Sequence, residues 1–176
     1  MTRVRRPTGK RLDRRYLQGT VKHGGGNVMV WGCFSAEGVG PIFKIEGNMD
    51  RFQYKNILQT QMLPHAITKM PPDWQFQRDN DPKHTSKVVK DWLLEEQVCV
   101  MRWPAQSPDI NPIENLWEIV NRQINREQVH GNKNKLFDAL KQAWDGIKDT
   151  HINNLISSIP KRCAAIIKNN GYPIKY

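Results

Sequence analysis

Two stretches decide the fold of this chain: WQFQRDNDPKHTS at residues 74–86 and WPAQSPDINPIENLW at residues 103–117. In the first, aromatic and polar residues alternate over 74–78 as in a short strand, which runs directly into Asp79. In the second, a proline-rich loop leads into a long helix with Glu114 in its first turn. One acidic residue is therefore expected at the end of a strand and the other at the start of a helix, with 34 residues between them.

The elements around these stretches alternate between strands and helices. VMVWGCF at 28–34 and IFKI at 42–45 predict a hairpin, and residues 50–69 predict an amphipathic helix interrupted near Pro64. The other predicted elements are a helix capped by Thr85 or Ser86 that ends at Gln97, a strand over 98–103, a long helix from Ile113, and helices over 133–148 and 151–168, the last broken by Pro160. This order predicts an α/β fold with a mixed sheet and flanking helices.

The chain is long enough for one domain, and its charge favours a polyanionic partner. We expect a basic arm at residues 1–26, a domain at 27–150 and a helical tail at 151–176. The net charge is +10, and nucleic acid is the usual partner of a soluble basic domain. The arm is either a solvated segment or one that contacts DNA phosphates. Its eight basic residues are Arg3, Arg5, Arg6, Lys10, Arg11, Arg14, Arg15 and Lys22.

The cysteines and the apolar runs indicate in which compartment of the cell the protein is expected. Cys33, Cys99 and Cys163 lie far apart and none forms a C-x-x-C pair, which predicts buried, reduced thiols rather than disulfides or zinc ligands. The basic start is not followed by an apolar stretch typical of a signal peptide, and no run approaches the ~18 apolar residues of a membrane span. We expect a soluble intracellular protein with no membrane partner.

Asp79 and Glu114 are the candidate metal ligands. Phosphodiester cleavage needs an activated oxygen nucleophile and a stabilised leaving oxygen, and two divalent metals ~3.5–4 Å apart supply both. Carboxylates at a strand end and on a facing helix suit Mg²⁺, which binds hard oxygen ligands. Two alternatives stay open: Asp81 is a second candidate ligand, and Asn111 with Pro112 and Glu114 also fits a helix capping box.

Residues 77–86 and 103–117 resemble the second and third acidic blocks of the Tc/mariner superfamily of DDE transposases, including the 34-residue spacing of its Tc-like branch. VMVWGCF at 28–34 and the segments at 5–7 and 11–13 resemble the same branch. The resemblance implies an RNase H-like catalytic domain that cuts transposon ends and joins them to target DNA with Mg²⁺ or Mn²⁺. It also implies double-stranded DNA as the partner and the nucleus as the location.

The resemblance assigns roles to four residues of this sequence. Asp79 matches the second catalytic aspartate and Glu114 the catalytic glutamate, both of which bind metal in the family. Asn80 and His84 belong to the same motif, with supporting roles in shaping the loop and contacting DNA. For His84 the alternative is a residue that merely starts the following helix.

The resemblance fails at the family's first aspartate, which lies on the first, central strand of the fold. That strand precedes the segment that residues 5–7 resemble, and Asp13 does not follow an apolar strand. We therefore expect a gap in the sheet, which a second copy of the chain can fill, and no activity from this chain by itself. The alternative function is a non-catalytic nucleic-acid-binding relic of a transposase. Another RNase H-like nuclease is a third reading, which the SPDINPIENLW block argues against.

Overall fold

The computed structural model has one regular sheet among the residues that it describes, and this sheet is an antiparallel hairpin. Its strands are β1 (Met29–Ser35) and β2 (Gly38–Ile45), which confirms the predicted hairpin, although β2 begins four residues before the predicted strand at 42–45. Gly38 has a φ of +125°, a conformation that L side chains rarely adopt, so glycine suits this turn. The described residues are 27–104, 107, 110–125, 127–129 and 131–171, and the basic arm at 1–26 lies outside them.

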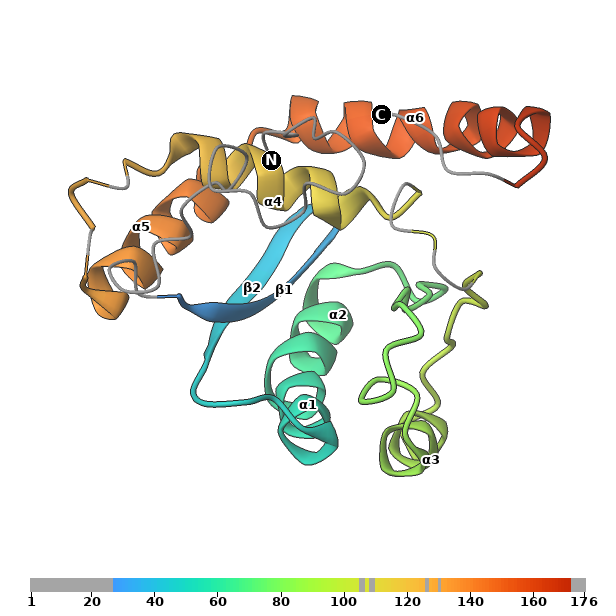
Figure 1. Ribbon diagram of the computed structural model, residues 1–176. Helices are drawn as coiled ribbons and strands as arrows, with labels where there is room; N and C mark the ends of the chain where they lie inside the picture. Colours follow the sequence, from blue (N-terminus) through green and yellow to red (C-terminus); the bar gives the residue numbers. More distant parts are fainter. Residues whose placement is uncertain (1–26, 105–106, 108–109, 126, 130, 172–176) are drawn as a thin grey trace, which may run out of the picture.

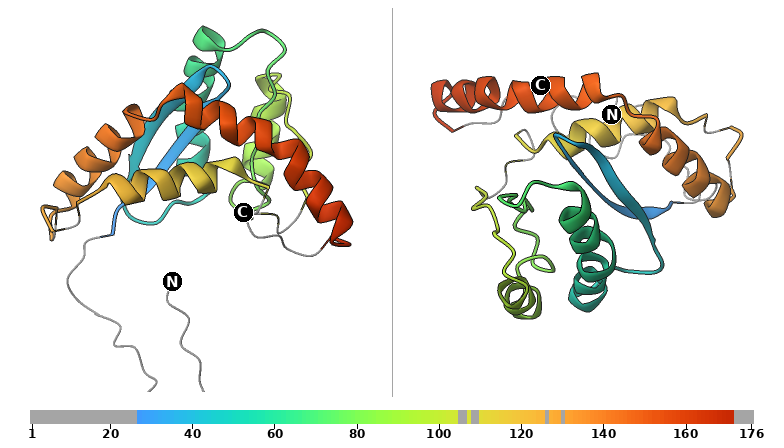
Figure 2. Two further views of the ribbon diagram at one scale, coloured as in Figure 1. Left: turned by 90° about the horizontal axis from the view of Figure 1, so that it is seen from above. Right: turned by 180° about the vertical axis from the view of Figure 1, so that it is seen from behind.

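Helices cover the hairpin in two groups (Figure 1). Figure 2 shows the same separation from behind, with α4, α5 and α6 on one side of the hairpin and α1, α2 and α3 on the other. The first group comprises α4 (Pro112–Gln123), α5 (Lys133–Asp145) and α6 (Asp149–Lys168). The second comprises α1 (Arg51–Ile57), the π-helical segment η2 (Leu58–Met62), α2 (Leu63–Lys69) and α3 (Lys87–Glu95).

Each group of helices has its own hydrophobic core. The first core includes Tyr54, Leu58, Phe76 and Trp92, and the second includes Leu116, Val120, Trp144 and Ile152. The hairpin contributes to both, because successive side chains of a strand point to opposite faces. Trp31 packs against the first core and its neighbour Val30 against the second. Each fully buried large side chain contributes roughly 1.5–3 kcal/mol, so both cores stabilise the hairpin between them.

The two strands predicted around Asp79 are much shorter in the structure. They meet only at an isolated parallel bridge between Phe76 and Val100. The Phe76 N–H donates to Cys99 O over 2.8 Å, and the Met101 N–H donates to Phe76 O over 2.9 Å. Within the described residues this bridge is not hydrogen-bonded to the hairpin. The predicted α/β class is confirmed, but the predicted strand lengths are wrong because, within residues 74–78, only Phe76 pairs with the facing segment.

Prolines interrupt the helices less than the sequence predicts. Residues 51–69 are helical throughout, with a π-helical segment ahead of Pro64, which occupies the first turn of α2. The π-helical turn, in which the Leu63 N–H donates to Leu58 O, lies directly ahead of this proline, so the helix continues past it. The predicted break at Pro160 is wrong, because this proline lies inside α6. That helix is held on both sides of the proline, by buried Ile152 in the second core and by buried Arg162.

The cysteines only partly match the expectation of buried thiols. All three are free, and burial raises the pKa of the Cys33 thiol to about 12. Cys99 and Cys163 are exposed, so the expectation is wrong for these two. Among the helices of the described residues, none is long and apolar enough to cross a membrane.

Candidate active site

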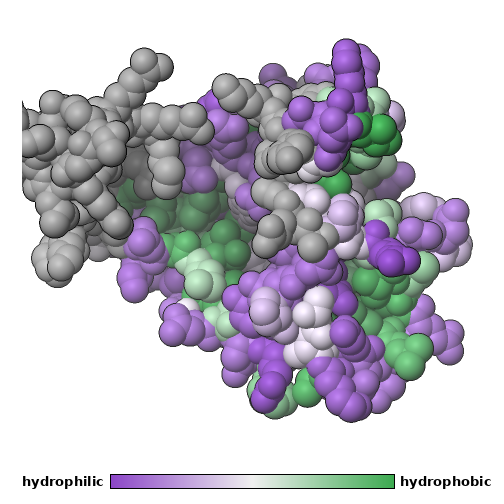
Figure 3. All heavy atoms as spheres, turned by 45° about the vertical axis from the view of Figure 1, so that its right-hand side comes forward, coloured by the Kyte–Doolittle hydropathy of each residue, from purple (hydrophilic) through white to green (hydrophobic). Residues whose placement is uncertain are grey.

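Asp79 and Glu114 line the same cavity, which has a volume of about 430 Å³. Residues 30–35 of β1 and residues 74–79 also line it, although these two segments are not hydrogen-bonded to each other. The cavity thus lies where the sequence predicts a gap in the sheet. Drawn as spheres, the molecule exposes hydrophobic side chains in a recess among hydrophilic ones (Figure 3). A second cavity, of about 390 Å³ between α2 and residues 96–99, contains neither of the two carboxylates.

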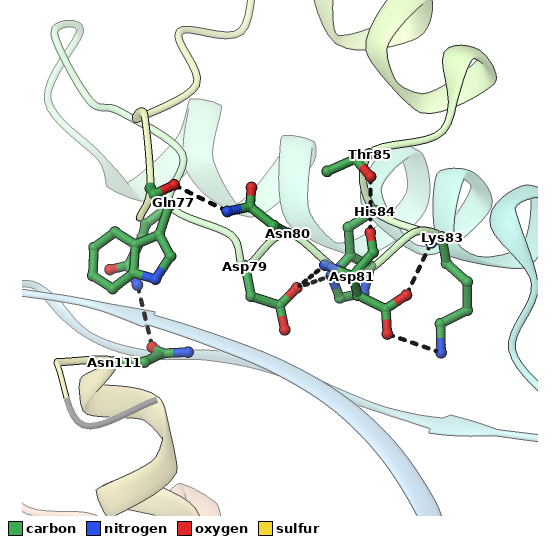
Figure 4. A network of polar contacts seen from close by, with 9 residues as sticks. Gln77, Asp79, Asn80, Asp81, Lys83, His84, Thr85 and Asn111 are labelled. Carbon is green, nitrogen blue, oxygen red and sulfur yellow. Dashed lines mark hydrogen bonds and ion pairs between the residues drawn. The ribbon is translucent and has the colours of Figure 1, made fainter. Parts of the chain in front are cut away.

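The Asp79 carboxylate is half-exposed and is held through one oxygen. Its Oδ1 accepts a hydrogen bond from the Asp81 backbone N–H over 3.1 Å and lies 2.5 Å from Nδ1 of His84 (Figure 4). In the described part of the chain, Oδ2 has no hydrogen-bond donor or cation beside it. A carboxylate held on one oxygen and open on the other is suited to bind a metal ion or a donor group from a ligand.

Asp81 interacts with residues of its own loop and does not line the cavity. Its carboxylate accepts the Lys83 backbone N–H over 2.9 Å and forms an ion pair of 3.4 Å with the Lys83 ammonium. Burial acts to raise the pKa of Asp81, but the Lys83 hydrogen bonds and charge, together with His84, outweigh it and lower the pKa below its ordinary value. The geometry therefore favours Asp79 over Asp81 as the candidate ligand.

Glu114 is exposed in the first turn of α4, and none of the described residues forms a hydrogen bond or ion pair with its carboxylate. The alternative of a capping box is wrong, because the Asn111 side chain makes no cap hydrogen bond. Asn111 Oδ1 instead accepts from Gln77 Nε2 over 3.2 Å. A negative charge near a helix N-terminus is favourable, so α4 tolerates a free carboxylate at this place.

Two hydrogen bonds tie the two motifs together (Figure 4). One is the bond from Gln77 to Asn111, and the other runs from Asn80 Nδ2 to the Trp103 carbonyl over 3.0 Å. Asn80 thus links the loop that follows Asp79 to the backbone at Trp103. Gln77 and Asn111 were not among the predicted site residues, because both lie inside the motifs without any local signal that they pair.

The donor set fits part of a divalent metal site. Carboxylate oxygens are the ligands that Mg²⁺ and similar hard cations prefer, and two residues that carry carboxylates line one cavity here. No group of three or more His, Cys, Asp or Glu side chains that could hold a metal ion occurs in the described residues. Asp79 and Glu114 are thus two candidate ligands.

The described body carries little net charge. It contains 17 Lys and Arg against 15 Asp and Glu, so most of the charge of +10 lies elsewhere in the chain. The eight basic residues predicted to contact DNA lie in the arm at 1–26, outside the described residues. Their role remains a prediction.

Known proteins similar to this chain are transposases. The Tc1 transposase of Caenorhabditis elegans is 48% identical over 173 residues, which is 98% of this chain, and the chain spans 63% of the length of that relative. The Tc3 transposase of the same species is 33% identical over 154 residues, covering 87% of this chain and 47% of the relative. Both support the resemblance to the Tc/mariner superfamily.

Solved structures of the Mos1 mariner transposase share the fold. Its catalytic domain superposes with a TM-score of 0.71 at 18% identity, covering 84% of this chain and 76% of that one. A paired end complex with Mn gives a TM-score of 0.77 at 18% identity, covering 90% and 48%. The predicted RNase H-like fold is confirmed. The family model described as DDE superfamily endonuclease matches residues 2–137, and this chain belongs to that family.

Proposed function

We propose that this chain is the catalytic domain of a DNA transposase of the Tc/mariner superfamily, which cuts transposon ends and joins them to target DNA. The observation that carries the proposal is that Asp79 and Glu114, from two segments far apart in the sequence, open onto one cavity. Family membership supplies the class of reaction. The relatives' activity is carried over as a proposal because the chain spans 63% of the length of the Tc1 transposase.

Each side chain of the site has a separate role in this proposal. Asp79 and Glu114 supply oxygen ligands, His84 orients the Asp79 carboxylate, and Asn80 fixes the loop against residue 103. Bound Mg²⁺ or Mn²⁺ would activate the attacking oxygen and stabilise the leaving oxygen. The Gln77–Asn111 bond keeps the two carboxylate-bearing segments in register.

Double-stranded DNA is the proposed partner. The solved Mos1 structures include a strand transfer complex and a paired end complex with Mn, which supports DNA ends and Mn²⁺ for this chain as well. The near balance of charge in the described body leaves phosphate binding to the basic arm. Nuclear localisation is carried by the family resemblance alone, whereas a homo-oligomer is proposed because a second copy of the chain can fill the gap expected in the sheet.

The test is a chimera in which this chain is joined to the part of the Tc1 transposase that lies outside the match. We expect Mg²⁺- or Mn²⁺-dependent cleavage of a plasmid carrying Tc1 ends, and strand transfer of the cut ends. Asp79→Asn and Glu114→Gln should each abolish cleavage while the circular dichroism spectrum stays unchanged. Glu118→Gln is the matched control, because Glu118 lies one turn further along α4 and pairs with Arg122 instead.

Each outcome separates the proposal from its alternative. Cleavage that survives Asp79→Asn or Glu114→Gln would contradict the assignment of the two carboxylates. A folded chimera that binds DNA and never cuts it, with either metal, would favour the non-catalytic relic. Loss of cleavage with Glu118→Gln as well would show that the assay reports helix stability rather than metal binding.

A further inference from the structure

We propose that Tyr54 is a positioning residue, whose buried ring holds the imidazole of His84 and through it sets the orientation of the Asp79 carboxylate. The Tyr54 and His84 rings are stacked, with centroids 4.0 Å apart and planes inclined by 29°. His84 Nδ1 in turn lies 2.5 Å from Asp79 Oδ1. The proposal rests on the proposed function in one respect, that Asp79 is a metal ligand.

Tyr54 is itself firmly held. It is 1% exposed and packs in the first core with Leu58 and Phe76. Its helix, α1, is capped by Asp50, whose carboxylate accepts hydrogen bonds from the backbone N–H groups of Phe52 and Gln53 over 2.9 and 2.8 Å. Such a side-chain cap stabilises a helix start by about 1 kcal/mol. The Tyr54 ring therefore has little freedom to move, and it provides a fixed surface for the His84 imidazole.

The hydroxyl of Tyr54 stays neutral. Burial raises the pKa of Tyr54 well above its ordinary value, and the charges of Asp79 and Asp81 act in the same direction while Arg78 opposes them. The ring is thus an uncharged surface beside the carboxylates. Its contribution to His84 is contact and stacking rather than a charge.

The surroundings of His84 favour one arrangement of its ring. The side chain is 17% exposed, and its Nε2 is buried without a hydrogen-bond partner among the described residues. Turning the ring over would replace Nδ1 by a carbon atom and break the contact with Asp79. The short contact to a carboxylate also places a hydrogen on Nδ1, because a donor facing an ionised oxygen makes a strong hydrogen bond.

Asp79 depends on this arrangement more than its neighbour does. Asp81 is fixed by three contacts with Lys83 and Thr85, whereas in the described structure His84 is the one side chain that forms a hydrogen bond or ion pair with the Asp79 carboxylate. The Asp79 side chain is 53% exposed, so without His84 it would turn freely toward solvent. Groups that orient a metal ligand typically change metal affinity 10- to 100-fold when removed.

The first measurement is the tautomer of His84 in the metal-free chain, read from long-range ¹H–¹⁵N correlations of ¹⁵N-histidine-labelled protein. We expect a single form with the hydrogen on Nδ1 in the wild type and in Tyr54→Phe, which keeps the stacked ring. Tyr54→Leu should give a mixture of tautomers. Leu58→Ala is the matched control, because Leu58 is fully buried in the same core and its loss should leave the His84 signal unchanged.

The second measurement is Mn²⁺ binding to the full chain by electron paramagnetic resonance. Tyr54→Leu and His84→Gln should weaken Mn²⁺ binding about tenfold, the lower end expected for such groups. His84→Asn should retain affinity, because an asparagine amide nitrogen lies at the same distance along the side chain as Nδ1. Tyr54→Phe and Leu58→Ala should retain it too.

Two results would overturn the proposal. One is a Tyr54→Leu variant that keeps the single tautomer, and the other is a Leu58→Ala variant that loses the tautomer to the same extent. Mn²⁺ binding that Asp79→Asn leaves unchanged, together with the expected tautomer pattern, would refute the metal role of Asp79 and leave the positioning by Tyr54 supported. The two failures are therefore distinguishable.

Discussion

Gln77 and Asn111 are joined by a hydrogen bond of 3.2 Å from Nε2 to Oδ1, across 34 positions of sequence. Gln77 lies two residues before Asp79, and Asn111 is the residue before α4, which carries Glu114. The bond therefore connects the two segments that bring carboxylates to the cavity. It also occupies the Asn111 oxygen that would otherwise cap its own helix.

We predict that Gln77→Ala lowers the free energy of unfolding by about 1 kcal/mol, the usual contribution of one such hydrogen bond. A double-mutant cycle with Asn111→Ala, measured by urea denaturation, should show that the two substitutions are coupled by a similar amount. Gln75→Ala is the control, because Gln75 is exposed near the same cavity and has no hydrogen bond in the described structure. Additive effects of the two substitutions would show that the bond contributes nothing.

The chain by itself is expected not to cut DNA. Asp79 and Glu114 provide two carboxylates, and no group of three or more His, Cys, Asp or Glu side chains that could hold a metal ion occurs among the described residues. Mg²⁺ loses its water reluctantly and requires near-octahedral ligands, so two carboxylates should bind it weakly. A supercoiled-plasmid nicking assay in Mg²⁺ and Mn²⁺ should give background values for the chain, Asp79→Ala and Glu114→Ala alike. Nicking by the unmodified chain that both substitutions abolish would refute this prediction.

Affinity for duplex DNA should fall steeply with salt and depend weakly on sequence. Each phosphate neutralised by a basic side chain releases counterions and contributes about −0.9 to the slope of log K against log salt. Deleting residues 1–26, which hold eight of the 27 Lys and Arg, should flatten that slope in fluorescence anisotropy titrations. An unchanged slope after the deletion would remove the arm from the DNA-binding surface.

Arg162 should be important for stability through its contacts with α4. It is 3% exposed, and it donates from Nη1 to Asn115 Oδ1 over 2.7 Å and from Nε to Ser158 Oγ over 2.8 Å. Arg162→Ala should destabilise the fold by about 2–3 kcal/mol, because hydrogen bonds from a charged donor are among the stronger ones. Thermal unfolding of this variant and of Lys161→Ala, whose side chain is exposed, should show a large shift for the first and almost none for the second.

The sequence by itself determined the features that depend on neighbouring residues. The apolar runs at 28–34 and 42–45 were enough to predict the hairpin, and the proline-rich loop marked the start of α4 to within one residue. The motifs containing Asp79 and Glu114 identified the family because residue identity and spacing are properties of the chain alone. None of these predictions required knowledge of what the segments pack against.

Tertiary structure decided which partners each residue obtained. The capping box at Asn111 does not form, because the Asn111 side chain accepts a hydrogen bond from Gln77 instead. Helix α6 continues through Pro160 because buried residues hold the helix on both sides of the proline. Tyr54 stacks on His84 because α1 packs beside α3 and the loop before it. A local sequence pattern shows only which side of a segment is apolar. The cap, the continued helix and the stacked rings depend instead on contacts between segments many residues apart. The free energies of these contacts are comparable to those of the local preferences that they override.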